Sequence, residues 1–395
     1  MLPSFVPLSS TPVAAQYLAT FLKPEMLHIY RQITALREFQ PVVLCQKREN
    51  PEKFPFEHIQ VLPKPPTHQI RRFFQKQLLG RPVTIYRSEA RRILFALHEI
   101  RAQVLHVYFG HIGVHLLPLL EICPLPVVVS FHGADAQVNM DKPVYREFTR
   151  RMFEKATLLL VRSQSLGKRL EALGASTSRI RLHRTGIPLT QIAFTKRDAP
   201  PDGAWRCVQA CRLIAKKGLH TSIRAFAEFA QQYPKARFVI AGDGPLEGEL
   251  KALSDSLGLS DRIEFAGFLP EEKLRALYAD SHLFLHPSQM GEDGDQEGVP
   301  NSMLEAMASG LPVAATLHGG IPDAVEHGVS GLLTPEGEAS ALAGSLFTFA
   351  SNPSRYAGMS AAAAAQAAAK FDLRAQTHVL EECYREAISA KSGQP

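Results

Sequence analysis

The chain alternates short apolar runs with longer segments whose apolar residues recur at helical spacing. The short runs are rich in β-branched residues, which is typical of strands buried on both faces. They are VLHVYF (104–109), PVVVSF (126–131), ATLLLV (156–161), WRCVQAC (205–211), ARFVIAG (236–242), RIEFAG (262–267), SHLFLH (281–286) and LPVAAT (311–316). Helical patterns lie between them, for example over 142–154 and 165–173. This alternation predicts an α/β fold in which parallel sheets carry helices on both faces.

A stretch with little periodicity separates two such arrays. Residues 184–205 contain three prolines and two glycines, which predicts a linker between two doubly wound domains. We place the first domain at 1–187 and the second at 188–371, and we expect the final helix, 372–390, to pack back on the first domain. Ligands of open parallel sheets bind beyond the carboxyl ends of the strands, so functional residues are expected directly after strands.

The composition is that of an ordinary globular protein, with 45% hydrophobic and 21% charged residues in 395 positions. No apolar run reaches the roughly 18 residues that a spanning helix needs. The first cation is Lys23, so the charged start of a signal peptide is missing. Five cysteines are spread thinly, and no second pair joins Cys207 and Cys211 to complete a zinc site, so free thiols are expected. We therefore expect an unexported, cytoplasmic protein.

Charge is distributed unevenly along the chain, whose formal net charge is +6. Through Leu189 the sequence has 26 basic and 13 acidic residues, whereas the remainder has 18 basic and 25 acidic residues. A basic first half is typical of a protein that faces an anionic partner, such as phosphates, a membrane surface or nucleic acid. No nucleic-acid-binding motif accompanies this charge, so no nucleic acid partner is expected.

One segment of the basic half combines its charge with an apolar face. Over HQIRRFFQKQLLGR (68–81), helical spacing puts Ile70, Phe73, Phe74 and Leu78 on one face beside four cations. Basic amphipathic helices lie on anionic membranes, so peripheral contact with the inner membrane face is one interpretation. The alternative is that the apolar face packs on the protein's own sheet.

The stretch GDQEGVPNSMLEAMASGLPVAA (294–315) predicts a short helix with a phosphate site at its start. Pro300 suits the first position of a helix and Gly310 its end, which gives a helix over about 301–309. Free N–H groups and the positive dipole at the N-terminus favour a phosphate there. The residues that form this end are Gly298, Val299, Asn301 and Ser302.

Two glutamates bracket the predicted phosphate site. Glu305 lies roughly 6 Å along the helix, which is close to the step from a diphosphate to the ribose of the same nucleotide. Glu297 precedes the helix and would face a sugar on the other side of the diphosphate. In CRLIAKKG, Arg212 and Lys217 follow a strand and provide a planar fork and a point charge for phosphate oxygens. Together these residues predict a site for a nucleotide-diphosphate-sugar.

The segments CRLIAKKG, AGDGP, FAGFLP, EGVPNSMLEAMASGLPVAAT and GGIPDAVEHGVSGLLTP resemble the donor half of the family-4 retaining glycosyltransferases of GT-B fold. The resemblance is continuous over Val208–Leu342, and GDQEGVP and HRTGIP are most similar to the colanic-acid and exopolysaccharide branch. In the first half, LHVYFGHIGV and VVVSFHGAD are similar to the family, while the first 100 residues match loosely. The resemblance implies two Rossmann-like domains facing across a cleft, an acceptor side first and a donor side second.

The resemblance also implies an activity. A sugar would pass, with retained configuration and without metal or cofactor, from a nucleotide-diphosphate-sugar to a glycan or lipid-linked glycan acceptor in exopolysaccharide or cell-surface polysaccharide biosynthesis. Glu297 would contact the hydroxyls of the transferred sugar, and Glu305 would contact the ribose. Arg212 and Lys217 would stabilise the departing diphosphate, as electrostatic catalysis requires.

Further positions follow from the same resemblance. His132 ends the PVVVSF strand and would contact the donor sugar at the transition state. Phe268 would lie against the nucleotide base, with a core aromatic as the alternative, and Gly242 of AGDGP belongs to the donor-binding set. Asp135 and His106 are weaker candidates that suit structural roles. The start of the chain departs from many relatives, because FVPLSSTPVAAQYLATFLKPEMLHIYRQ contains no glycine for a diphosphate-binding loop.

Other functions fit the residues less well. A D-x-D at 293–295 is the metal motif of another class of transferases, but the Arg/Lys clamp already neutralises phosphates, so no metal is expected. GDGPLEG (242–248) differs in spacing from a dinucleotide fingerprint. A sugar-nucleotide 2-epimerase would share the architecture and the donor site. A non-catalytic, donor-binding scaffold of a polysaccharide assembly is the alternative outside the enzymes.

Overall fold

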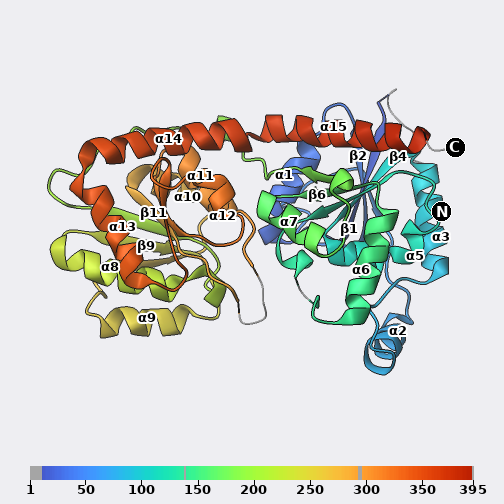
Figure 1. Ribbon diagram of the computed structural model, residues 1–395, viewed down its shortest axis with the longest axis horizontal. Helices are drawn as coiled ribbons and strands as arrows, with labels where there is room; N and C mark the ends of the chain where they lie inside the picture. Colours follow the sequence, from blue (N-terminus) through green and yellow to red (C-terminus); the bar gives the residue numbers. More distant parts are fainter. Residues whose placement is uncertain (1–10, 138, 292–295, 394–395) are drawn as a thin grey trace. The chain divides into compact units, whose positions relative to one another are not determined.

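The computed structural model describes residues 11–137, 139–291 and 296–393. The chain divides into two compact units, each with a parallel sheet between layers of helices (Figure 1). The first unit comprises the chain up to Gly186 together with the end of the chain from Leu373. The second unit is Ile187–Asp372. The predicted α/β architecture with two doubly wound sheets is confirmed.

The first unit is built on a seven-stranded parallel sheet in the order β3-β2-β1-β4-β5-β6-β7. The strands are β1 Val13–Phe21, β2 Gln40–Arg48, β3 Ile59–Val61, β4 Ala102–Tyr108, β5 Val127–Phe131, β6 Leu158–Val161 and β7 Ile180–Leu182. The order reverses between β1 and β4, which pair directly. Such a reversal opens a crevice at the carboxyl ends of the two strands, where ligands of this architecture bind.

The α-helices in the described part of this unit are α1 Leu27–Ala35, α2 His68–Arg72, α3 Arg87–Glu99, α4 Gly110–His115, α5 Leu117–Leu120, α6 Pro143–Lys155, α7 Gln164–Ala172 and α15 Leu373–Ser392. The last of these, α15, packs on the first unit although it follows the second in sequence. Leu380 and Tyr384 of α15 are fully buried in one cluster with Val104 and Val128 of the sheet. The Tyr384 hydroxyl also bonds His106 Nδ1 at 2.7 Å, which ties the helix to β4.

The second unit has a six-stranded parallel sheet in the order β10-β9-β8-β11-β12-β13. Its strands are β8 Arg206–Ala210, β9 Arg237–Ala241, β10 Ile263–Gly267, β11 Leu283–His286, β12 Val313–Thr316 and β13 Gly331–Thr334. Its helices are α8 Leu219–Gln232, α9 Glu247–Ser256, α10 Glu271–Asp280, α11 Asn301–Ala308, α12 Ile321–Ala324, α13 Ala339–Ser351 and α14 Pro353–Phe371. The buried apolar strands pack between these helices, as their sequences predict.

Most of the predicted linker belongs to the second unit. Arg197, at its centre, is buried and donates hydrogen bonds to the carbonyl oxygens of Tyr278 at 2.9 Å, Ser281 at 2.9 Å and Ser309 at 3.2 Å. A guanidinium that satisfies several carbonyl groups at once fixes the backbone around it. The boundary between the two units, at Gly186 and Ile187, lies within the stretch 184–205, and Arg197 ties the later part of that stretch to the second unit.

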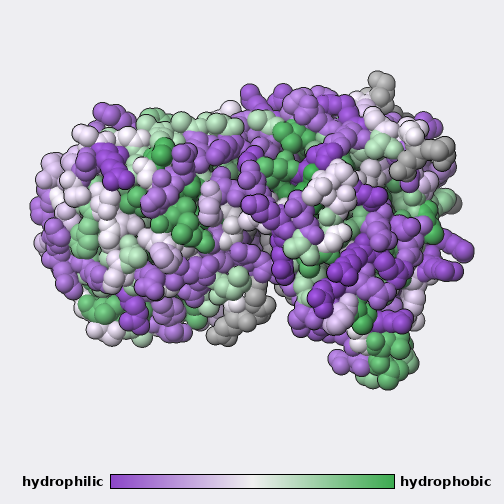
Figure 2. Space-filling view, viewed as in Figure 1, coloured by the Kyte–Doolittle hydropathy of each residue, from purple (hydrophilic) through white to green (hydrophobic). Residues whose placement is uncertain are grey.

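The segment 68–81 differs from the single amphipathic helix that its spacing predicts. After α2 the chain continues as a π-helical turn over Phe73–Leu78. The side chains of Ile70, Phe73, Phe74 and Leu78 are 50–67% exposed, so the alternative that they pack on the protein's own sheet is wrong. Figure 2 shows the hydrophobic surface that they form at the tip labelled α2 in Figure 1. Among the described helices, none is long and apolar enough to cross a membrane.

Candidate functional site

The candidate site lies in the second unit, at the carboxyl ends of β8 and β11. The first turn of α11 and the loop before it are held against the sheet, because the Ser302 hydroxyl donates to the carbonyl oxygen of Ala210 at 2.6 Å and Val299 of the loop is buried. Gly319 has φ +55°, and a Cβ there would overlap the carbonyl oxygen of Glu297. The absence of a side chain at Gly319 therefore lets the Glu297 loop approach the turn after β12.

Lys217 and Glu297 form a largely buried ion pair at this place. Lys217 ends a 3₁₀ turn over Ala215–Lys217, directly after β8. Gly218 follows with φ +63°, and a Cβ there would overlap the carbonyl oxygen of Pro287 at the end of β11. The pair therefore joins the two loops that leave β8 and β11, and it brings together two residues that the sequence assigned to the same ligand.

Burial and charge act in opposite directions on the Glu297 carboxyl group. Burial alone would raise its pKa, but the positive charges around it, with Lys217 first, lower the pKa from 4.5 to about 2. Glu297 is thus a carboxylate throughout the physiological range. With a side chain only 13% exposed, it provides a fixed negative charge and two acceptor oxygens to a ligand.

His318 positions Glu297 and is a site residue that the sequence interpretation missed. Its Nε2 accepts the backbone N–H of Glu297 at 2.9 Å, and its Nδ1 donates to Glu336 Oε1 at 2.6 Å. Glu336 in turn accepts the N–H of Met290 at 2.8 Å. The neutral Nδ1–H tautomer is therefore fixed on both sides. The sequence feature that could have indicated His318 is its place just after the LPVAAT strand, with Leu317 between them, in HGG.

His286 is a second missed residue. It ends β11, is fully buried, and neither ring nitrogen has a hydrogen-bond partner within the described chain. Burial, followed by the charge of Lys217, lowers its pKa to about 3, so it is neutral. Its place at the carboxyl end of SHLFLH was the signal that could have found it.

The remaining donor-binding candidates lie around this pair in different environments. Arg212 is exposed and forms no ion pair with any described residue. Phe268 is 65% exposed, and its N–H donates to Asp243 Oδ1 at 3.0 Å, so the alternative of a core aromatic is wrong. A Cβ at Gly242 would overlap the carbonyl oxygen of Cys211, which makes this glycine necessary for packing of the two loops.

Glu305 lies in the second turn of α11 and is partly buried. Burial and the nearby charge of Glu305 raise the pKa of Tyr278 well above its usual value, so Tyr278 is a protonated neighbour. Its hydroxyl is buried without a partner among the described residues. At the start of the helix, Gly298 and Asn301 are partly exposed beside the N-terminal N–H groups. This end of α11 can therefore reach a ligand.

His132 lies in the first unit, directly after β5. Its Nε2 is 3.1 Å from the Ser130 hydroxyl, and its Nδ1 is 3.4 Å from His28 Nε2. Burial, followed by the charge of Arg162, lowers its pKa well below 6.5, so it is a neutral imidazole. Asp135 accepts its backbone N–H at 2.8 Å.

Asp135 and His106, the weaker candidates, make structural contacts within the first unit. Asp135 also accepts the N–H groups of Gly110 and Gly133 at 2.8 and 2.9 Å, and His106 is fully buried against Tyr384. The D-x-D at 293–295 lies outside the described residues. The described groups that could together hold a metal ion are Glu38, His378 and Glu381 in the first unit, where Glu381 already accepts two backbone N–H groups.

Comparison with known proteins identifies the family. The family model "Glycosyl transferases group 1" matches residues 193–366, and "Glycosyltransferase Family 4" matches residues 26–191. WcaL of Salmonella typhimurium, a glycosyltransferase assigned to colanic acid biosynthesis, is 35% identical over 275 residues, 67% of each chain. AmsK of Erwinia amylovora, an amylovoran biosynthesis glycosyltransferase, is 36% identical over 61% of this chain and 60% of its own.

A solved structure gives the same result for the fold. The structure of HepE from Anabaena in complex with UDP has a TM-score of 0.76, with 20% sequence identity over 95% of this chain and 100% of HepE. At this identity the likeness concerns the fold alone. The chain therefore belongs to the group 1, family 4 glycosyltransferases and has their GT-B fold.

Proposed function

We propose that this protein is a retaining, metal-independent transferase that moves a sugar from a nucleotide-diphosphate-sugar to a glycan or lipid-linked glycan in exopolysaccharide biosynthesis. The observation that carries the proposal is the buried pair of Lys217 and Glu297 beside the N-terminus of α11. Colanic acid and amylovoran synthesis by relatives supports the pathway, and UDP in the HepE complex supports the class of donor.

The proposed mechanism follows from the charges of these residues. The bond between the anomeric carbon and the diphosphate oxygen breaks, and its electron pair stays on the oxygen. Lys217, Arg212 and the N-terminus of α11 stabilise the negative charge that develops there. The acceptor hydroxyl attacks from the same face, and its proton passes to the departing phosphate oxygen. Glu297 holds the sugar by its hydroxyls, and Glu305 holds the ribose.

A first test measures donor binding. We expect UDP-, GDP- or ADP-sugars of one base class to raise the midpoint of thermal unfolding, because a ligand at about 100 times its dissociation constant adds roughly 2.7 kcal/mol of stability. The shift should be the same with EDTA, and Glu305→Ala should weaken it by removing the ribose contact. A shift that EDTA abolishes would contradict metal independence, and no shift from any nucleotide sugar would contradict the donor site.

The same donor panel separates the alternatives. Slow release of the free sugar without acceptor indicates bond cleavage at the anomeric carbon, as a transferase requires. Stabilisation by a donor without any turnover would favour the non-catalytic scaffold. Appearance of a second nucleotide sugar, instead of free sugar, would favour a sugar-nucleotide 2-epimerase.

A lipid-linked acceptor would require contact with a membrane, and the segment 68–81 provides a surface for it. We propose that Ile70, Phe73, Phe74 and Leu78 enter an anionic membrane surface while the neighbouring cations contact lipid phosphates. The exposed face is apolar, and Arg72, Lys76 and the other basic groups around it match the charge of anionic lipids.

The membrane proposal predicts a specific loss of binding. Phe73→Glu with Phe74→Glu should lower binding to anionic lipid vesicles at least about tenfold, because burial of each aromatic side chain is worth roughly 1.5–3 kcal/mol. The matched control is Phe95→Glu with Ile122→Glu, which changes two other exposed apolar residues of the first unit. Cosedimentation measures both. Equal binding by the two variants would contradict the proposal.

A further inference from the structure

Both residues of the Lys217–Glu297 pair are held through their backbone by a buried polar side chain. His318 accepts the backbone N–H of Glu297 at 2.9 Å. On the other side of the pair, Gln209 of β8 donates from its Nε2 to the carbonyl oxygen of Lys217 at 2.8 Å. Gln209 is fully buried in a strand whose neighbouring residues are apolar. A buried polar group is costly unless it is hydrogen-bonded, so the partners of Gln209 indicate its role.

The side-chain amide of Gln209 has one orientation. Ser222 of α8, which is also fully buried, donates from its hydroxyl to Gln209 Oε1 at 2.5 Å. Because Oε1 is the acceptor, Nε2 is the end of the amide that donates to Lys217. The same Nε2 lies 3.6 Å from the Cys211 Sγ. The amide therefore links α8 to the loop that follows β8.

The carbonyl group of Lys217 lies where the 3₁₀ turn passes into α8. Gly218, the next residue, accepts a hydrogen bond from the Ser222 N–H at 3.0 Å, which opens the helix. Lys217 precedes the helix, and its N–H donates to the carbonyl oxygen of Ile214, at the start of the turn, at 3.0 Å. With Gln209 bonded to its carbonyl oxygen, Lys217 is fixed on both sides of its Cα atom. Its side chain therefore leaves the backbone in one direction, toward the paired carboxylate.

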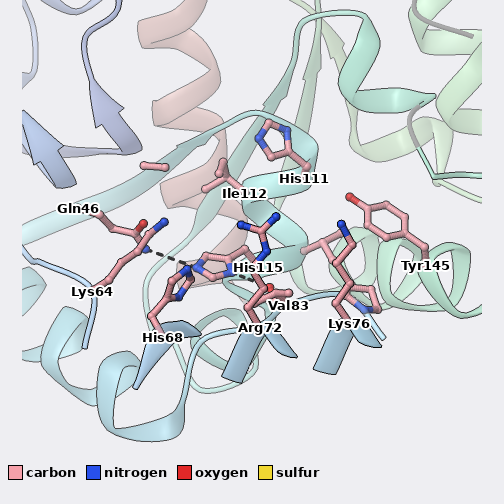
Figure 3. A pocket seen from close by; sticks show the side chains of 13 residues that line it. Gln46, Lys64, His68, Arg72, Lys76, Val83, His111, Ile112, His115 and Tyr145 are labelled. Atoms are coloured by element: carbon pink, nitrogen blue, oxygen red, sulfur yellow. Dashed lines mark hydrogen bonds between the residues drawn. The ribbon is translucent and has the colours of Figure 1, made fainter. Parts of the chain in front are cut away.

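A glutamine of the first unit has a different environment. Gln46, near the end of β2, lines a pocket of about 310 Å³ and faces His115 Nε2 at 3.4 Å (Figure 3). An amide in the wall of a pocket can reach a ligand directly. Gln209 is 0% exposed, and the two ends of its amide are bonded to Lys217 and Ser222. It can act on a ligand only through the residue that it holds.

We propose that Gln209 is a positioning residue of the donor site, which holds Lys217 where it binds the diphosphate. The inference rests on the proposed function and deepens it. Without the amide, the Lys217 carbonyl group and the Ser222 hydroxyl would lose their buried partner, so the turn that carries Lys217 would shift. The departing oxygen that Lys217 stabilises belongs to the phosphate next to the sugar, which a nucleoside monophosphate lacks. The effect of Gln209 is therefore specific to diphosphates.

The test measures dissociation constants of the whole chain by titration calorimetry, with UDP, GDP and ADP and the three corresponding monophosphates as probes. Gln209→Leu should weaken the diphosphate that the wild type binds most tightly at least tenfold, and should leave its monophosphate within twofold. Gln366→Leu is the matched control, because Gln366 Nε2 also donates to a backbone carbonyl of the second unit, that of Ala324, at 2.7 Å. The control should leave both affinities within twofold. Equal weakening of diphosphate and monophosphate by Gln209→Leu would overturn the proposal, since general damage to the fold has no such selectivity.

A double variant shows whether Gln209 acts through Lys217. Lys217→Met removes the charge that the amide is proposed to position. In that background, Gln209→Leu should weaken the diphosphate by less than a further twofold, because residues that act as one unit do not have additive effects. If the two losses multiplied, Gln209 would act independently of Lys217, and the proposal would be wrong.

Ser222→Ala keeps the test decisive if Gln209→Leu does not fold. It removes only the hydroxyl that orients the amide, and should weaken the diphosphate at least threefold with the monophosphate unchanged. Unchanged diphosphate affinity in Ser222→Ala would overturn the role of the oriented amide. The wild type separates this inference from the proposed function: its failure to bind any nucleoside diphosphate would reject the proposed function, whereas binding that Gln209→Leu fully retains would reject the inference alone.

Discussion

Glu297→Ala is expected to lower the turnover number at least about a thousandfold, equivalent to about 4 kcal/mol at 1.36 kcal/mol per tenfold change. The carboxylate is proposed to hold the transferred sugar, and such contacts gain strength as positive charge develops on the ring. Nucleotide binding should persist, because Glu305, Arg212 and the N-terminus of α11 remain. Affinity for the free nucleotide is even expected to rise slightly, since Lys217 loses its carboxylate partner and is available to the diphosphate.

The experiment compares transfer rates and nucleotide dissociation constants for Glu297→Ala, Glu297→Gln and Glu272→Ala. Glu272 is exposed on α10 and has no ion pair with a described residue, so its loss controls for a general change of charge. Glu297→Gln keeps the shape but not the charge, and should fall between the other two. Turnover of Glu297→Ala equal to that of Glu272→Ala would contradict the role in sugar binding. Loss of nucleotide binding would instead indicate that Glu297 contacts the nucleotide.

All eight apolar runs form strands. Seven of them are mostly buried, because a strand covered on both faces has apolar residues at almost every position, whereas only Ile263 is buried in β10. The predicted runs include neither β1 nor β2. In β1 the fully buried Gln16 interrupts the apolar pattern and bonds Tyr108 and Tyr384. Those partners come from distant parts of the chain, so no local pattern indicates that a buried glutamine is satisfied there. β3 and β7 were missed because each has only three residues, which is too short for a clear pattern. β13 was missed as well, although it is as long as β12.

The candidate site was predictable in part. The sequence assigns Glu297 to the ligand from its place before the α11 helix and Lys217 from its place after a strand, and the structure joins the two across 80 positions of sequence. Their direct ion pair was not predicted, because strand order decides which loops meet. His318 was missed for a different reason: it acts on the backbone of Glu297, and a residue that positions another one has no chemical signature of its own in the sequence. The apolar face at 68–81 could be predicted from the spacing of its residues. Its exposure could not, because that depends on which other segments pack against it.

Gly319→Ala is expected to lower turnover at least about a hundredfold, since a displacement of about 1 Å in a catalytic group can cost this much. Gly319 has φ +55°, and its added Cβ would overlap the backbone oxygen of Glu297, so the loop that carries the carboxylate must move. Gly258→Ala is the matched control, because Gly258 has φ +69° with open space around its missing Cβ. Both variants lose about 1–2 kcal/mol from the left-handed backbone alone.

The comparison of these two glycine variants separates backbone strain from displacement of the site. Urea unfolding should show a similar loss for the common strain, with a further loss in Gly319→Ala from the displaced loop. Steady-state kinetics should show near-normal turnover for Gly258→Ala and the large decrease only for Gly319→Ala. Because Phe268 and Arg212 lie on other loops, nucleotide binding should survive in both variants. If Gly319→Ala kept turnover within threefold of Gly258→Ala, close contact with the turn after β12 would not be what positions Glu297 for catalysis.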